Sequence, residues 1–482
     1  MSVVRSRSLA LGLVLVPALA AGCSLGERNS GGGDGILQVE ATVDPDNSLI
    51  AHVTVTADEP TPVALSFESD DTGPRRMEST EESASHEFTV VGLRAETRYD
   101  FLAEATAGGS ASDPVSMTTG GLPENAPTAE VVRAAQDPRR PDAGITIFGL
   151  MSEQVGDGPA YYGVDDDGQV VWYLDREEPT PRGPVVRDAG GGRILAFFHD
   201  SIEQVDLDGS VVDVFDMTAA PSWHHDAVPM PGGGYLTLGS ETRTVDGDEV
   251  RGDTIIELDS SGDVVWEWSS FDHLDTSRYP GDLATTEARS GGTDWTHSNS
   301  VSYDEKTDQI LMSVRSQGWV VNIDHATGEV VWIAGEADGT DPGYDASFLD
   351  LQEGSWMSGQ HAATLTRDGD LVAYDNRNET GGEQENSRLV VYELDADSGA
   401  ARQTVEYVAS KYTNSLGDVD ELASGNYLVT SGGPAGEEGV DDTAYIAETD
   451  PGGQPVWEIA LAETRIYQSE RVSWQALGQE PL

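Results

Sequence analysis

Along most of the chain, short runs that alternate apolar and polar positions are separated by turns rich in Asp, Gly, Ser and Pro. Residues 51–56 and 63–67 show this alternation clearly. An apolar side chain at every second position is typical of a β-strand with one buried face, and Gly, Pro and Asp mark the turns between strands. The pattern therefore predicts an all-β protein.

In the second part of the chain one unit recurs: an apolar strand, an acidic residue, a turn ending in Gly, and a second strand that often closes on Trp. The copies lie at residues 162–172, 255–266, 321–332 and 446–457 with the Trp, and at 204–212 and 391–399 without it. A hairpin cannot bury its own faces, so repeated hairpins favour the radial stacking of four-stranded blades. We therefore expect a six-bladed β-propeller over residues 144–482, reached through a linker at 121–143.

The start of the chain predicts a lipoprotein signal peptide over residues 1–22. The apolar run at residues 9–21 follows a basic start and is too short for an ordinary membrane span. Its end, Leu-Ala-Ala-Gly-Cys, resembles a bacterial lipobox, which implies cleavage before Cys23 and lipidation of that residue. A plain secretory signal with an incidental cysteine is the alternative. We expect an exported protein, lipid-anchored to the cell envelope through a flexible tether at residues 23–35.

Residues 36–120 predict a small β-sandwich that precedes the propeller. The run from Val91 to Tyr99, continuing into an apolar strand up to Ala105, resembles the fibronectin type III pattern. The tyrosine corner of that fold would fall on Tyr99. This resemblance implies a fold and no activity, and we expect the domain to act as a spacer.

Composition limits the classes of partner. The chain has 482 residues, with 27 Lys and Arg against 86 Asp and Glu, which gives a formal net charge of −59. Such a charge argues against nucleic-acid backbones or anionic lipid surfaces as partners. Cys23 is the single cysteine, so an intrachain disulfide and a cysteine-based metal site are both excluded.

Histidines gather at one position of the repeat. When the inner strands are aligned by their turns, His224, His297 and His361 share a register, with His225 one step further on. Equivalent positions at the start of inner strands face one mouth of the central channel, so four of the nine histidines are expected to converge. Clustered imidazoles serve metal binding, acid–base work or nucleophilic work.

The residues around these histidines favour an anionic ligand over a metal ion. Three histidines would suit zinc or copper, yet their spacings carry no local ligand signature. Asp226 and Asn299 indicate that a carboxylate and an amide accompany the rings, which fits either chemistry. Arg315, at the far end of the strand pair that begins with His297, adds a guanidinium, which binds an oxyanion and repels a cation.

Several motifs together resemble the arylsulfate sulfotransferases, bacterial enzymes that do not use a nucleotide sulfate donor. The motifs are residues 297–301 with Arg315, residues 225–226, 360–362, 374–376 with 387–388, 417–418 with 424–427, and 465–472. The resemblance covers roughly residues 145–475. That family has a six-bladed propeller, in agreement with the hairpin count.

The resemblance implies a ping-pong transfer of a sulfuryl group from an aryl sulfate to a phenol through a sulfohistidine, with no cofactor. His361 matches the nucleophile, and His297, Asn299 and Arg315 match the residues that hold the sulfuryl oxygens and stabilise charge. A loose transition state of this kind needs an unprotonated nitrogen nucleophile, a proton donor at the leaving oxygen and cations on the remaining oxygens.

Two assignments within that scheme stay open. The remaining catalytic histidine is His225 by its following acidic residue or His224 by repeat register, and we favour His225, with His224 binding substrate. The family also uses a hydroxyl from the last blade, for which Thr413 and Ser415 are equal candidates.

Two other classes of protein compete with this interpretation. Residues 323–332 also resemble the tryptophan-docking repeat of quinoprotein propellers, but that group would show eight repeats where the sequence shows six. A non-catalytic envelope lipoprotein that binds other proteins or glycans is the second alternative, with its histidines as relics. The natural donor and acceptor are not specified by the sequence.

Overall fold

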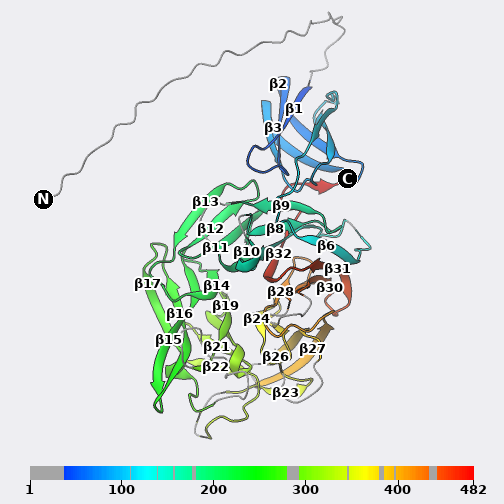
Figure 1. Cartoon of the computed structure of the whole chain (residues 1–482). Helices are drawn as coiled ribbons and strands as arrows, with labels where there is room; N and C mark the ends of the chain where they lie inside the picture. The colour runs from blue at the N-terminus through cyan, green and yellow to red at the C-terminus, as the bar shows by residue number, and fades with distance from the viewer. Residues whose placement is uncertain are drawn as a thin grey trace, which may run out of the picture.

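Six sheets of four or five strands surround a central channel in the computed structural model, and a further sheet forms an N-terminal domain (Figure 1). The structure describes residues 37–482 except 109, 138, 156–157, 176–180, 279–292, 343, 345–346, 379–384, 396–397 and 434–441. The predicted signal peptide, Cys23 and the tether lie outside the described residues. The prediction of an all-β fold with a six-bladed propeller is confirmed.

Each blade is an antiparallel sheet with one strand beside the channel. Blade 1 consists of β32 (Ile466–Ser473), β7 (Gly144–Leu150), β8 (Tyr161–Val164) and β9 (Val170–Leu174). Blade 2 consists of β10 (Pro181–Gly190), β11 (Arg193–Phe198), β12 (Ser201–Asp206) and β13 (Val211–Asp216). Blade 3 consists of β14 (His224–Pro229), β15 (Tyr235–Val245), β16 (Asp248–Leu258) and β17 (Val264–Ser269).

The second half of the ring repeats this order. Blade 4 consists of β19 (Ser298–Asp304), β20 (Gln309–Val314), β21 (Trp319–Asp324) and β22 (Val330–Ala334). Blade 5 consists of β24 (His361–Leu365), β25 (Leu371–Asp375), β26 (Arg388–Asp395) and β27 (Ala400–Val408). Blade 6 consists of β28 (Asp418–Glu421), β29 (Tyr427–Ser431), β30 (Ala444–Thr449) and β31 (Pro455–Ala462). The six predicted hairpins are the outer pairs of these blades.

Tryptophans of the repeat join neighbouring blades. Trp172 and Trp457 are fully buried, and each extends its indole to the hairpin turn of the next blade. The Nε1 of Trp172 donates to the carbonyl of Leu207 at 2.7 Å, and the Nε1 of Trp457 donates to the carbonyl of Asp166 at 2.8 Å. A buried indole needs such an acceptor, so the Trp that ends a hairpin both fills the space between blades and fixes their spacing.

Blade 1 closes the ring with strands from both ends of the propeller, because β32 pairs with β7. Three short strands extend other blades. They are β6 (Thr128–Arg133) on β31, β18 (Thr293–Asp294) on β16, and β23 (Asp350–Glu353) on β27. The segment interpreted as a linker therefore contributes a strand to blade 6.

The N-terminal domain is built from five strands near the start of the chain and one short strand from its C-terminal end. The strands are β1 (Leu37–Val43), β2 (Ala51–Glu68), β3 (Arg75–Val90), β4 (Arg98–Ala105) and β5 (Val115–Thr118), joined by β33 (Glu480–Pro481), which pairs with β3. Tyr99 is fully buried, and its hydroxyl accepts a hydrogen bond from the backbone N–H of Arg94 at 2.9 Å. This is the contact of a tyrosine corner. Membership of the fibronectin type III class stays a prediction.

The N-terminal domain packs directly on the propeller. The guanidinium of Arg75 lies 4.9 Å from the ring centroid of Phe67 and 4.2 Å from that of Trp474, and it donates to the side chain of Gln479. Arg94 pairs with Asp165 in the hairpin turn of blade 1 at 2.7 Å. Helices are rare: α1 (Ser152–Val155), α2 (Ser270–His273) and a 3-10 turn, η2 (Arg315–Gln317). Within the described part of the chain, none has the length and apolarity to cross a bilayer.

Candidate active site

Four of the six inner strands carry a residue with left-handed backbone at or just before their start. These residues are His225, His297, Ala362 and Leu416, with φ of 58°, 45°, 52° and 66°. Non-glycine residues rarely adopt this conformation, so its recurrence marks which residues of these blades are structurally equivalent. His225 is therefore equivalent to His297, and His224 to His361, so the predicted register of His224, His297 and His361 is wrong by one residue.

The expected convergence of the four rings does occur. The ring centroid of His225 lies 4.9 Å from that of His224 and 5.5 Å from that of His297. The ring of Tyr467, on β32, lies 6.0 Å from His225 and 6.0 Å from His361, so it stands beside both. Four strands of four different blades thus bring their first residues to one mouth of the channel.

His361 is held in one tautomer by Asn376. The Nδ2 of Asn376 donates to the carbonyls of Thr413 and Leu416, both at 2.9 Å, which leaves its Oδ1 to face His361 Nδ1 at 2.7 Å. Since Oδ1 can only accept, Nδ1 carries the hydrogen and Nε2 keeps its lone pair. Burial, the charge of Arg315 and that of His297 lower the pKa of His361 to about 3, so the ring is neutral at neutral pH.

His297 and Arg315 lie on the same side of the site. Asp294 Oδ2 lies 2.7 Å from His297 Nδ1, so the carboxylate fixes the hydrogen on Nδ1. Arg315, in η2, donates through Nη2 to the carbonyl of Asn414 at 3.1 Å. Its Nε is buried without a hydrogen-bond partner among the described residues, and burial lowers the pKa of the guanidinium. A buried N–H donor without a partner, next to the imidazoles, is suited to bind an anionic oxygen.

Asn299, expected to hold sulfuryl oxygens, has part of its amide already engaged. Its Nδ2 donates to the carbonyl of Gln360 at 2.8 Å, and its Oδ1 is buried without a partner among the described residues. The hydroxyl of Tyr467 donates to the backbone carbonyl of Asn299 at 3.2 Å. One amide hydrogen of Asn299 is thus committed to the next blade.

The carboxylate expected beside the rings is not Asp226. Asp226 is fully buried, and its two carboxylate oxygens accept from Arg187 Nη2 at 2.8 and 2.9 Å, so its charge is paired with that guanidinium. Its Oδ2 also accepts from the backbone N–H of Val301 at 3.0 Å. Asp253 contacts His224 and Asp294 contacts His297, so these two carboxylates accompany the rings in place of Asp226.

The carboxylate of Asp253 contacts the ring of His224. Its Oδ1 is 3.2 Å from His224 Nε2, while its Oδ2 accepts from Thr296 Oγ1 at 2.7 Å and from the backbone N–H of Ser298 at 2.5 Å. Although burial raises it, these donors and the charge of His224 hold the pKa of Asp253 at about 2. The Nδ1 atoms of His224 and His225 are 2.7 Å apart. Burial, then the charge of His224, lowers the pKa of His225 well below its ordinary value.

The two hydroxyl candidates differ in place. Thr413 is fully buried, and its Oγ1 lies 2.9 Å from the hydroxyl of Tyr374 and 3.3 Å from Asn376 Nδ2, so it supports the residue that orients His361. Ser415 is half-buried, and its Oγ donates to Asn414 Oδ1 at 3.3 Å. Among the residues that the structure describes, no group of three or more His, Cys, Asp or Glu is arranged to hold a metal ion.

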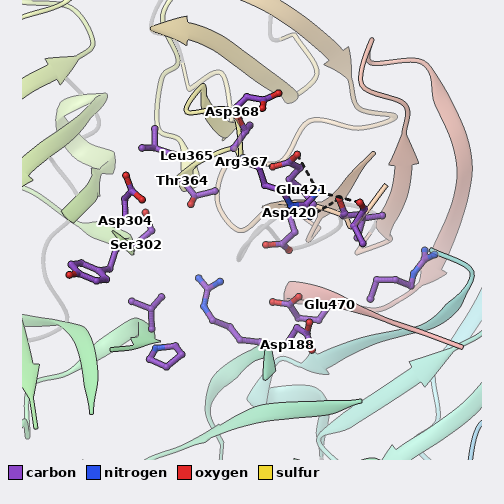
Figure 2. Close-up of a pocket in the computed structure, with 18 of the residues that line it drawn as sticks. Asp188, Ser302, Asp304, Thr364, Leu365, Arg367, Asp368, Asp420, Glu421 and Glu470 are labelled. Atoms are coloured by element: carbon purple, nitrogen blue, oxygen red, sulfur yellow. Dashed lines mark hydrogen bonds and ion pairs between the residues drawn. The ribbon is translucent and has the colours of Figure 1, made fainter. Parts of the chain in front are cut away.

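A cavity of about 900 Å³ occupies the opposite end of the channel, where the inner strands finish (Figure 2). Its described lining includes Asp188, Asp420 and Glu470 and contains no histidine. Figure 2 shows the carboxylate of Asp420 directed toward the interior between blades 1 and 6. Burial raises the pKa of Asp420 to about 6 and that of Glu470 well above its ordinary value. The carboxylates at this end lie beside Arg187, Arg367 and Arg471, which also line the cavity.

Sequence reasoning missed Asp253 and Asp294 as partners of the histidines and gave no role to Asn376 or Tyr467. Asp294 precedes His297 by three residues and was within reach of a local motif search. Asp253 lies in the middle of β16, 45 residues from Ser298, the backbone of which it holds. Its contact with His224 joins β16 to β14 within blade 3, and only the fold of that blade reveals it.

Comparisons with known proteins identify a family. A family model described as arylsulfotransferase (ASST) matches residues 136–468. The arylsulfate sulfotransferase AssT of Escherichia coli O6:H1 is 26% identical over 316 residues, covering 52% of this chain and 52% of that protein. The arylsulfate sulfotransferase AssT of Lelliottia amnigena is 24% identical over 334 residues, covering 55% and 54%. The chain thus spans about half the length of these curated relatives.

Similarity to solved structures is weak. A protein of unknown function from Bacteroides caccae aligns with a TM-score of 0.38 and 12% identity, over 68% of this chain and 98% of that one. The calcium-binding protein regucalcin from Agrobacterium tumefaciens aligns with a TM-score of 0.36 and 11% identity, over 73% and 95%. We draw nothing about function from similarities at this level.

Proposed function

The chain belongs to the arylsulfotransferase family, and on that premise we propose that it transfers a sulfuryl group from an aryl sulfate to a phenol through a sulfated His361. The observation that carries the proposal is the state of His361: its Nδ1 hydrogen is held by Asn376, and its Nε2 is an unprotonated nitrogen. A nucleophile of that kind is what sulfuryl transfer from an ester requires.

In the first half-reaction, Nε2 of His361 attacks the sulfur of the aryl sulfate. The N–S bond forms, the bond from sulfur to the aryl oxygen breaks, and the leaving oxygen takes a proton. Arg315 stabilises the sulfuryl oxygens, and its buried, unpaired Nε is the donor available for them. Asp294 holds the hydrogen at His297 Nδ1, so His297 donates to a sulfuryl oxygen through Nε2 only as an imidazolium, the form that pairs with this carboxylate.

In the second half-reaction a phenol takes the place of the first product. Its oxygen attacks the sulfur, the N–S bond breaks, and a base removes the phenolic proton. His225 is the residue that we assign to these proton transfers, since its ring lies among the other three and its Nε2 has no hydrogen-bond partner among the described residues. The two half-reactions together leave the enzyme unchanged.

The test uses the purified soluble form that begins after Cys23, with 4-nitrophenyl sulfate in the presence and absence of phenol. We expect nitrophenolate release to depend on phenol, and intact mass spectrometry without phenol to detect one added SO₃ group. His361→Ala should abolish both signals, whereas His325→Ala, on the outer face of blade 4, should abolish neither. Equal release with and without phenol would indicate a hydrolase, and no release from any aryl sulfate would favour a binding propeller.

We also propose that the protein is exported and lipid-anchored through Cys23. The support is the lipobox-like sequence of residues 19–23. In a bacterial host that processes lipoproteins, the full chain should fractionate with membranes and incorporate labelled fatty acid. Cys23→Ser should lose both properties, and its failure to do so would refute the anchor without affecting the proposed activity.

A further inference from the structure

Asp253, His224 and His225 form one chain of contacts that ends at the candidate site. Asp253 Oδ1 faces His224 Nε2 at 3.2 Å, and His224 Nδ1 faces His225 Nδ1 at 2.7 Å. Asp253 comes from β16 of blade 3, whereas both histidines come from the start of β14. The carboxylate is almost completely buried: its Oδ1 reaches the site through the two rings, and its Oδ2 accepts from Thr296 and Ser298, the neighbours of His297.

The positions of the protons follow from the partners. His224 Nε2 faces the carboxylate of Asp253 and the carbonyl of Gly239, both at 3.2 Å, and these groups only accept, so Nε2 carries a hydrogen. Two imidazole nitrogens at 2.7 Å need one proton between them, on His224 or on His225. If the shared proton is on His225, its Nε2 is a base. If it is on His224, neutral His225 carries its hydrogen on Nε2 and is a donor.

We propose that Asp253, His224 and His225 relay the proton of the transfer reaction, so that positive charge comes to rest on His224 and not on His225. As His225 Nε2 takes the proton from the acceptor phenol, the O–H bond breaks and an N–H bond forms. The shared proton leaves His225 Nδ1 for His224 Nδ1 in the same step. The reverse shift supplies a proton to the leaving aryl oxygen. This inference rests on the proposed function.

The surroundings explain why a relay is needed. His225 faces His297 from blade 4, His361 from blade 5 and Arg251 from β16, and together with burial these groups disfavour an imidazolium at that position. His224 instead faces an ionised carboxylate that Thr296 and Ser298 hold in place. Coulomb's law therefore favours the charge on the outer ring of the pair. His224 and Asp253 do not touch substrate in this scheme, so both are positioning residues.

The first test is the dependence of rate on the acceptor in His224→Gln, because glutamine offers His225 a polar partner that cannot take a proton. We expect the burst of nitrophenolate from 4-nitrophenyl sulfate to persist, since nitrophenolate is a good leaving group. Transfer to phenol should fall by about 10²-fold, the low end of what positioned proton transfer contributes, and the loss should grow as the acceptor becomes less acidic. His199→Gln, an exposed histidine on blade 2, is the matched control.

Two outcomes of that test would overturn the relay. One is a loss in His224→Gln that is equal for all donors and acceptors, which would indicate a purely structural role. The other is unchanged transfer to poorly acidic phenols.

The second test does not require activity. In protein labelled with ¹⁵N-histidine, the signals of His224 and His225 are assigned by their disappearance in the two single Gln variants. We expect positive charge on the pair to be found on His224, protonated on both nitrogens, while His225 stays neutral, and Asp253→Asn should weaken this preference. Charge that appears on His225 would refute the relay. If the charge appears on His224 but the wild type transfers no sulfuryl group, the proposed function and the catalytic use of the relay fail, and the charge placement stands.

Discussion

Replacing Asn376 with Asp tests whether the neutral state of His361 depends on its amide partner. The substitution keeps an oxygen opposite His361 Nδ1 but turns the group that donates to Thr413 and Leu416 into an oxygen. A carboxylate would place a negative charge beside the imidazole. Two unit charges about 4 Å apart at an effective dielectric constant of about 20 attract by about 4 kcal/mol, which is about three pKa units.

The pKa of His361, about 3 in the wild type, should therefore rise to about 6 in Asn376→Asp. Protonation of His361 removes the nucleophile, so kcat/KM of the variant should fall as pH drops from 8 to 5, by about tenfold per unit below the new pKa. The wild type should show no loss from this group over that range. The two lost donor bonds should also cost about 1–3 kcal/mol each in the free energy of unfolding.

The assay is nitrophenolate release under kcat/KM conditions from pH 5 to pH 8.5, with urea unfolding at both extremes to confirm that the variant is folded. Asn376→Ser, which introduces no charge, is the control. An acidic limb in Asn376→Asp that is absent from Asn376→Ser would support the reasoning. Identical pH profiles for the wild type and both variants would refute it, because they would show that Asn376 does not set the protonation of His361.

Three further predictions concern stability, measured by urea unfolding. Burial lowers the pKa of His325, but its bonds to two carboxylates raise that pKa above the ordinary value. Its contribution to the free energy of unfolding is therefore complete below about pH 6.5 and is lost as pH rises through the folded pKa. His325→Gln should destabilise the protein at pH 6 and matter little at pH 9, and an equal loss at both pH values would contradict this. Arg187→Met leaves the carboxylate of Asp226 buried and unpaired and should lower the free energy of unfolding by about 3–5 kcal/mol. Adding Asp226→Asn should restore part of this stability, and no recovery would show that the buried charge is not the cause. Tyr99→Phe leaves the N–H of Arg94 without its acceptor and should cost about 1–3 kcal/mol with unchanged activity per folded molecule, and a neutral effect would deny the corner a structural role.

The ring of blades was predictable because its signal is local. Each outer hairpin carries its own turn and often its own Trp, so residues such as Trp172 and Trp457 are visible in sequence before their bonds to the next blade are known. The added strand β6 was not predictable, because an edge strand of six residues in a polar stretch has no periodic signature that outweighs a linker.

The histidine cluster was predictable, and its register was not. Alignment by turns overlooked the irregular pairing near the start of the inner strands, which runs from His224 to Ala227 in β14 but from Ser298 to Ser300 in β19. That residue decides which histidine is equivalent to His297. The role of Asp253 depends on its contacts with His224 in the same blade and with Thr296 and Ser298 of the next, and a single sequence does not encode such contacts in a readable pattern.

The pairing of β32 with β7 and of β33 with β3 has a consequence for biosynthesis. Arg471 contacts Thr146 across 325 residues, and Gln479 contacts Arg75 across 404 residues. During synthesis the N-terminal domain and the outer hairpins have time to form, but the first blade lacks its inner strand until residues 466–473 emerge. Ring closure is thus a late event, and until then an unpaired edge of β7 is open to chaperones or to misassembly. The strand that completes the mouth of the candidate site is among the last to be synthesised, so a chain truncated before residue 466 would hold its histidines on a ring that cannot close.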